Sequence, residues 1–186
     1  MEKGGLGQAT SKSVIAWADE MRLGLHGVIR NVWAKYGTKI VQKLQISYKW
    51  LYLNLAVDGV GGRLWWNWQP NMKKESVVAG LEAFSEAGVA VVVWDGAGSH
   101  KAAVVRAVEV GQIIQPGYAP ELNPAERVFL EVRRKIEGRV YSSLAEKQAA
   151  AEEYLKELAA DSEGIKRLAG WGWLKENLAS LPNNTV

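Results

Sequence analysis

Two aspartates stand where the chain could bring them together for metal-dependent chemistry. Asp19 follows the apolar run Val14–Ala18, and Asp95 follows the apolar run Val89–Trp94. Both runs predict buried strands. If those strands are parallel neighbours, the two side chains meet at the carboxyl edge of the sheet, where open α/β sheets bind ligands. An Asp at a strand end also commonly starts a turn, so each residue taken alone has a structural alternative.

The third candidate carboxylate is Glu126, which closes the proline-rich segment 116–126. Asn123 predicts a helix cap, with Pro124 as the first helical residue and Glu126 as the third. In one interpretation Glu126 reaches back to the Asn123 backbone N–H and only caps the helix. In the other, the first helical turn aims Glu126 at the two aspartates, and the prolines fix where that helix begins.

Carboxylates that converge in a low-dielectric pocket repel one another and need a compensating cation. The chain has no Cys and only two His, His26 and His100, which excludes Cys-ligated zinc, Fe–S clusters, thiol nucleophiles and multi-His sites. The remaining candidates are hard ions, Mg²⁺ or Mn²⁺. Two such ions roughly 4 Å apart can activate a water or a 3′-hydroxyl and stabilise the leaving oxygen in phosphoryl transfer.

Three further residues are candidates for a supporting role. Glu20 alternates to the opposite face of an extended strand from Asp19. His100 follows Asp95 by five positions and could face a phosphate or a metal-bound water, although a lone His near a helix start is more often structural. Asn123 is expected to cap its helix whatever else it does.

A basic segment suggests a polyanionic partner. Residues 21–74 hold nine bases and one acid, Asp58, so this segment carries +8 within a chain of net charge +3. A solvated basic face is the alternative. The candidate DNA-binding residues are Arg22, Arg30, Lys35, Lys39, Lys43 and Lys49.

The order of elements predicts an α/β domain. The chain has 186 residues, of which 48% are hydrophobic, enough for one packed core. Neither a membrane span nor a signal peptide is expected. The expected strands are 13–18, 27–34, 48–57, 63–69, 89–94 and 112–115, and the expected helices are 73–87, 99–110, 125–140, 143–160 and 165–178. Strands first, and then helices alternating with buried strands, indicate a mixed sheet flanked by helices.

Four segments carry a family resemblance: W-A-D-E-M-R-L-G-L at 17–25, G-V-I-R-N-V-W-A at 27–34, V-V-W-D-G-A-G-S-H at 92–100 and Q-P-G-Y-A-P-E-L-N-P-A-E-R-V-F at 115–129. In type and order they resemble the catalytic domain of IS630/Tc1/mariner-type DDE transposases, from about Val14 to Gly138. The N-P-x-E block is the most specific part. The family's usual Asp-Asn pair is Asp95-Gly96 here.

The resemblance implies an RNase H-like fold with a mixed five-stranded sheet and C-terminal helices. It implies that Asp19, Asp95 and Glu126 ligate two Mg²⁺ or Mn²⁺ ions, and that the substrates are transposon-end and target DNA. The expected domains are a flexible lead-in over 1–12 and a catalytic domain over 13–186, with a helical tail over about 143–180. No N-terminal helix-turn-helix domain is expected, since there is no room for one before Val14.

The expected function is therefore a metal-dependent DNA endonuclease and strand transferase in the prokaryotic cytoplasm, associated with the nucleoid. No membrane partner or organic cofactor is expected, and a homodimer is left open. Two alternatives remain from the sequence. One is a catalytically inactive nucleic-acid-binding or assembly fragment of a transposase, and the other is a cellular RNase H-like nuclease or resolvase.

Overall fold

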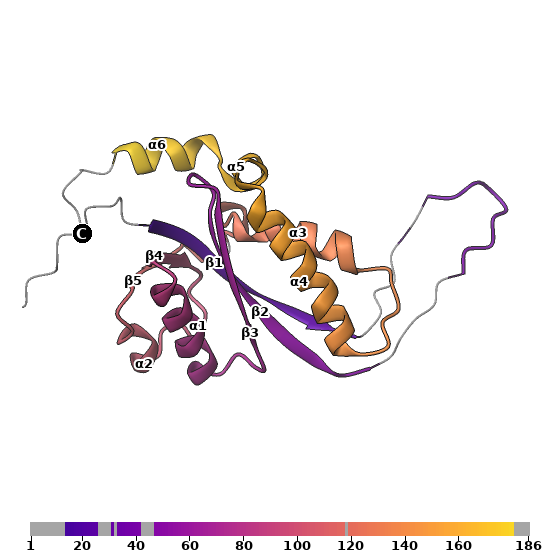
Figure 1. Cartoon of the computed structure of the whole chain (residues 1–186), viewed down its shortest axis with the longest axis horizontal. Helices are drawn as coiled ribbons and strands as arrows, with labels where there is room; N and C mark the ends of the chain where they lie inside the picture. Colours follow the sequence, from indigo (N-terminus) through magenta and orange to yellow (C-terminus); the bar gives the residue numbers. More distant parts are fainter. Residues whose placement is uncertain (1–13, 26–30, 32, 42–46, 118, 181–186) are drawn as a thin grey trace, which may run out of the picture.

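The computed structural model describes residues 14–25, 31, 33–41, 47–117 and 119–180, which contain a five-stranded sheet with helices on both faces (Figure 1). The strands are β1 (Val14–Gly24), β2 (Trp50–Asp58), β3 (Arg63–Gln69), β4 (Val89–Trp94) and β5 (Gly111–Ile114). Their order across the sheet is β3-β2-β1-β4-β5. The strands β1, β2 and β3 pair antiparallel, whereas β4 pairs parallel with both β1 and β5. The prediction of a mixed five-stranded sheet is confirmed.

The helices divide between the two faces of the sheet. In chain order they are α1 (Lys74–Glu86), α2 (Ala103–Arg106), the 3-10 helix η1 (Pro120–Leu122), α3 (Ala125–Ile136), α4 (Leu144–Ala160), α5 (Ser162–Ala169) and α6 (Gly172–Ser180). Helix α1 covers one face, and α3 and α4 cover the other (Figure 1). Among the described helices, none combines the length and the apolar character needed to cross a bilayer.

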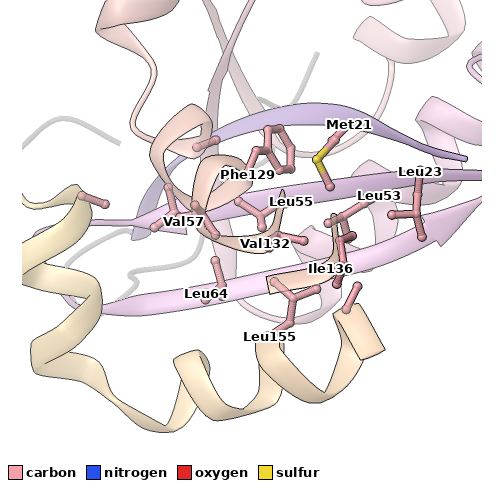
Figure 2. Close-up of a cluster of buried hydrophobic side chains, with 14 of the residues drawn as sticks. Met21, Leu23, Leu53, Leu55, Val57, Leu64, Phe129, Val132, Ile136 and Leu155 are labelled. Atoms are coloured by element: carbon pink, nitrogen blue, oxygen red, sulfur yellow. The ribbon is translucent and has the colours of Figure 1, made fainter. Parts of the chain in front are cut away.

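Alternation along β1 creates two separate cores. Ala16 and Ala18 pack toward α1 in a cluster that includes Leu81 and Phe84. Trp17 and Met21 point the other way, into a larger cluster with side chains of α3, α4 and α5. Figure 2 shows this larger core between the sheet and the helices. Because successive side chains of a strand alternate between its two faces, Asp19 and its neighbour Glu20 also face opposite sides of the sheet.

Two predicted elements, the strand 27–34 and the helix 99–110, differ from the structure. In the predicted strand 27–34, the described residues Asn31, Trp33 and Ala34 are in no strand, and the others lie outside the described residues. The predicted helix 99–110 is reduced to α2, Ala103–Arg106, which begins after Ala102 and not at Ser99. Residues 98–101 instead form a turn that buries the His100 side chain. The backbone of this segment therefore does not continue as a helix.

The helical tail also differs in detail. Helix α3 ends at Ile136 rather than Val140, because Gly138 takes a left-handed φ of 81°. Helix α4 begins at Leu144, one residue after the predicted start, and Ser143 caps it, since its Oγ accepts from the Glu146 N–H at 3.1 Å. The predicted helix 165–178 is two helices, α5 and α6, separated at Gly170. The expected lead-in over 1–12 lies outside the described residues.

Candidate active site

The parallel pairing of β1 with β4 places Asp19 and Asp95 at equivalent positions. Trp17 pairs with Val93, and each aspartate comes two residues later in its own strand direction. Side chains two apart share a face, so both carboxylates are expected on the same side of the sheet. Asp95 follows the end of β4, but Asp19 lies within β1, because that strand continues to Gly24 in its pairing with β2 and does not end at Ala18 as predicted. The two strands are neighbours, as the sequence argument required.

The carboxyl group of Asp19 carries the strongest electrostatic signal at this edge. Burial is the main cause that raises its pKa from 3.8 to about 7. The Glu20 backbone N–H donates to Asp19 Oδ1 at 2.7 Å and opposes this rise. The negative charges of Glu20, Glu126 and Asp95 add to it. Asp19 therefore lies within electrostatic reach of all the carboxylates that the sequence assigned to the site.

Asn123 connects the proline-rich segment to β1. Its amide nitrogen donates to the Ala18 carbonyl at 3.0 Å and lies 3.4 Å from Asp19 Oδ2. Its Oδ1 accepts from the Ala125 N–H at 3.1 Å, so the same side chain also satisfies the start of α3. Asn123 is 2% exposed, and this buried link fixes the helix start against the strand that carries Asp19.

The geometry excludes the capping-box interpretation of Glu126. The Asn123 N–H that a capping box would use donates to the Pro120 carbonyl at 3.0 Å. No hydrogen bond or ion pair engages the Glu126 carboxylate within the described part of the chain. Glu126 lies in the first turn of α3, and its charge acts on Asp19. It is thus left available at the shared edge.

Glu20 and His100 interact on the other side of the sheet. His100 is 1% exposed, its Nε2 lies 3.0 Å from Glu20 Oε1, and its Nδ1 lies 2.9 Å from Asp95 Oδ1. Burial lowers the pKa of His100, but the hydrogen bond and charge of Glu20, with a smaller effect of Asp95, outweigh burial and raise it. Of the two alternatives for His100, the enclosed ring favours the structural one over direct contact with a phosphate or a metal-bound water.

Two contributors to this arrangement, Gln115 and Trp94, were not singled out as site residues from the sequence. The Gln115 backbone N–H donates to the Trp94 carbonyl at 2.8 Å, and its side chain donates to the Leu122 carbonyl at 3.0 Å, so Gln115 ties the proline-rich segment to β4. Trp94 stacks on the His100 ring with centroids 4.0 Å apart. Only its position directly before Asp95 could have singled out Trp94.

The donor set at this edge fits a hard divalent cation. Asp19, Asp95 and Glu126 offer only carboxylate oxygens, and no described Lys or Arg forms an ion pair with any of them. Burial, and then the neighbouring negative charges, raise the pKa of Asp19. Within the described ranges, no three Asp, Glu or His side chains are packed closely enough to enclose an ion. The carboxylates therefore share an edge and an electrostatic field rather than a closed coordination sphere.

The candidate DNA-binding residues are partly described. Arg22, Lys35, Lys39 and Lys49 are exposed, and Arg30 and Lys43 lie outside the described residues. Residues 33–41 lie far from the sheet, in the segment that connects β1 to β2, which we call the excursion (Figure 1). Trp33 and Tyr36 are fully exposed beside these lysines. The Arg22 guanidinium lies over the Trp50 ring, 5.5 Å from its centroid.

The sequence and the fold both match known proteins. A family model described as DDE superfamily endonuclease matches residues 14–147. No match is found among curated proteins.

Solved structures of the Mos1 mariner transposase share the fold. The pre-cleavage Mos1 transpososome gives a TM-score of 0.64 at 15% identity, over 84% of this chain and 52% of that chain. The Mos1 paired-end complex with Mn gives 0.64 at 16% identity, over 84% and 51%. The Mos1 catalytic domain gives 0.51 at 16% identity, over 84% and 75%. The fold is thus RNase H-like, and the chain spans about half the length of the Mos1 chains in those complexes.

Proposed function

The chain belongs to the DDE superfamily endonucleases, and we propose that it breaks and joins DNA phosphodiester bonds at the edge formed by Asp19, Asp95 and Glu126. The observation that carries this proposal is the half-buried Asp19 carboxyl group, whose pKa is raised to about 7 mainly by burial and further by the negative charges of Glu20, Glu126 and Asp95. Such a concentration of carboxylates on a sheet edge is costly unless a cation is bound there.

In this proposal Asp19, Asp95 and Glu126 hold Mg²⁺ or Mn²⁺, two ions in all. Bound there, the ions supply Lewis-acid polarisation of the phosphate and neutralise charge on the entering and leaving oxygens. Asp19 must lose its proton to act as a ligand, so its raised pKa couples ion binding to proton release. Asn123 holds Asp19 against the start of α3, which keeps Glu126 directed at the same edge.

The proposal also names the substrate, which is DNA. The similar Mos1 structures include a paired-end complex with the left transposon end. Together with the exposed Arg22, Lys35, Lys39 and Lys49, this supports transposon-end and target DNA as substrates. Membership of the IS630 group, a homodimeric state and a place at the prokaryotic nucleoid are further predictions of the same proposal.

The first test is DNA nicking with Mg²⁺, with Mn²⁺ and with EDTA, using a supercoiled plasmid. Asp95→Asn keeps the shape of the side chain but removes its charge, and we expect it to reduce nicking by 10³-fold or more, or on the order of 4 kcal/mol in barrier. The matched control is Asp161→Asn on the far helical tail, where Asn caps α5 about as well as Asp. Equal nicking by wild type and Asp95→Asn would contradict the assignment.

A substrate panel separates the alternatives. Strand transfer of duplex ends supports a transposase, and preferential cleavage of RNA–DNA hybrids or of four-way junctions supports a cellular nuclease or resolvase. A protein that binds duplex DNA but nicks none of these substrates with either ion is the inactive binding fragment.

A further inference from the structure

His100 is a buried polar residue at the junction of the two strands that carry the aspartates. It lies in the turn 98–101 that follows β4, and its side chain is 1% exposed. Its contacts reach back across the sheet to β1, through Glu20, and to the end of β4, through Asp95. A single imidazole therefore joins the middle of β1 to the end of β4.

Both ring nitrogens of His100 are engaged, and each has a different partner. Nδ1 lies 3.1 Å from the Asp95 carbonyl oxygen and 2.9 Å from Asp95 Oδ1. Nε2 lies 3.0 Å from Glu20 Oε1. The Asp95 carbonyl oxygen can only accept, so a hydrogen bond with Nδ1 needs the proton on Nδ1, whereas the Glu20 carboxyl group can accept from Nε2 or, when protonated, donate to it.

The Trp94 indole fixes the plane in which those bonds point. It stacks on the imidazole at a centroid distance of 4.0 Å and an interplanar angle of 4°. Trp94 is itself 3% exposed and directly precedes Asp95, so the stack is part of the core beneath the site. The ring has no room to rotate away from Asp95.

The Asp95 carboxylate is consequently held by one oxygen. Its Oδ1 accepts from the Ala97 N–H at 3.0 Å and contacts His100 Nδ1, whereas no described residue donates to Oδ2. The Asp95 side chain is 59% exposed, so without these two contacts its carboxylate would rotate freely at the surface.

From this geometry we propose that His100 is a positioning residue: its Nδ1–H holds Asp95 Oδ1 and so presents Oδ2 to the ion, while its Nε2 anchors the ring to β1 through Glu20. The inference rests on the proposed function, because it takes Asp95 as a ligand. Orientation of metal-binding side chains by a buried hydrogen-bond partner typically changes ion affinity by about 10–100-fold.

Two isosteric substitutions separate the two ends of the ring. The amide nitrogen of Asn lies about where Nδ1 lies, so His100→Asn keeps a donor for Asp95 and loses the contact with Glu20. The Gln amide reaches about as far as Nε2, so His100→Gln keeps the contact with Glu20 and loses the donor for Asp95. A purely structural role predicts similar damage from both.

The measurement is Mn²⁺ affinity by electron paramagnetic resonance, with thermal unfolding of the ion-free proteins as the folding control. We expect His100→Gln to weaken Mn²⁺ binding by about 10-fold or more and His100→Asn to stay within about 3-fold of wild type. Equal Mn²⁺ affinity of both variants and wild type would overturn the positioning role. A wild type that binds no Mn²⁺ and nicks no DNA would overturn the proposed function instead.

A measurement on the unmodified chain keeps the inference testable if neither variant folds. Long-range ¹H–¹⁵N NMR of the wild-type protein without metal reports which imidazole nitrogen of His100 is protonated. A protonated Nδ1 that exchanges slowly with solvent is expected. An unprotonated Nδ1 would overturn the proposal, since it could not donate to Asp95.

Discussion

At Asp19, protein stability and the proposed chemistry make opposite demands. Folding transfers its carboxyl group from water to a buried edge next to three other carboxylates, which raises its pKa from 3.8 to about 7. Between these two pH values the folded protein binds a proton that the unfolded chain releases. The free energy of unfolding therefore falls as the pH rises from about 4 to about 7, and this contribution is level above that range.

Asp19→Asn should remove this pH-dependent penalty. We expect the variant to be more stable than wild type at pH 8, by at most roughly 4 kcal/mol, and to differ little from it near pH 4. The measurement is chemical denaturation across that pH range without divalent ions. The variant should also lose the stabilisation that millimolar Mg²⁺ gives the wild type at pH 8. A variant less stable than wild type at pH 8 would contradict the electrostatic account.

At the scale of elements, the β2–β3 hairpin turn is docked on the helical tail by close backbone packing. A Cβ added at Gly59 would lie 2.2 Å from the Ala169 carbonyl oxygen at the end of α5. A Cβ at Gly170 would meet the Gly59 carbonyl oxygen at 2.4 Å. Glycine at both Gly59 and Gly170 thus lets the end of α5 pack directly against the hairpin turn. This packing accounts for the break between α5 and α6.

Gly59→Ala should test this docking. Because the added methyl meets backbone rather than a flexible side chain, we expect a loss of about 1–3 kcal/mol in the free energy of unfolding. Gly98→Ala is the matched control, since a Cβ there meets nothing within 4 Å. It should change stability by less than about 0.5 kcal/mol. Urea denaturation of both variants gives the comparison, and equal stabilities would show that the turn is not tightly docked.

At the scale of the whole molecule, charge and chemistry occupy different regions. The carboxylates gather at the edge of the sheet, whereas Lys35 and Lys39 are exposed in the excursion between β1 and β2, away from it (Figure 1). A polyanion bound along the excursion would be held by phosphate contacts, and such contacts release counterions.

Lys35→Glu combined with Lys39→Glu should therefore weaken duplex DNA binding and flatten its salt dependence. Each phosphate contact contributes a slope of about −0.9 in log K against log salt concentration, so the double variant should lose a slope of roughly two. Fluorescence anisotropy at salt concentrations between about 50 and 200 mM measures this slope. Lys175→Glu on α6 is the control for charge alone, and an unchanged slope in the double variant would remove these lysines from the interface.

The sequence by itself determined the place of most strands, though not of the predicted strand 27–34, and it put the two aspartates on neighbouring strands. Arg63–Gln69 and Val89–Trp94 are strands with the predicted bounds, because their β-branched and aromatic runs leave few other ways to bury them. Asp19 and Asp95 could be placed on neighbouring strands because each directly follows an apolar run, although β1 continues past Asp19 to Gly24. These are local patterns, carried by residues within a few positions of one another.

Only the tertiary structure decided what the polar side chains contact. His100 meets Glu20 across 80 positions, and Asn123 meets Ala18 across 105. These contacts shortened the helix predicted from Ser99, and the Asn123 N–H found its partner in Pro120 rather than in Glu126. Local spacing sets which backbone conformations are favourable, but a buried donor or acceptor takes whichever partner the packed chain brings within reach.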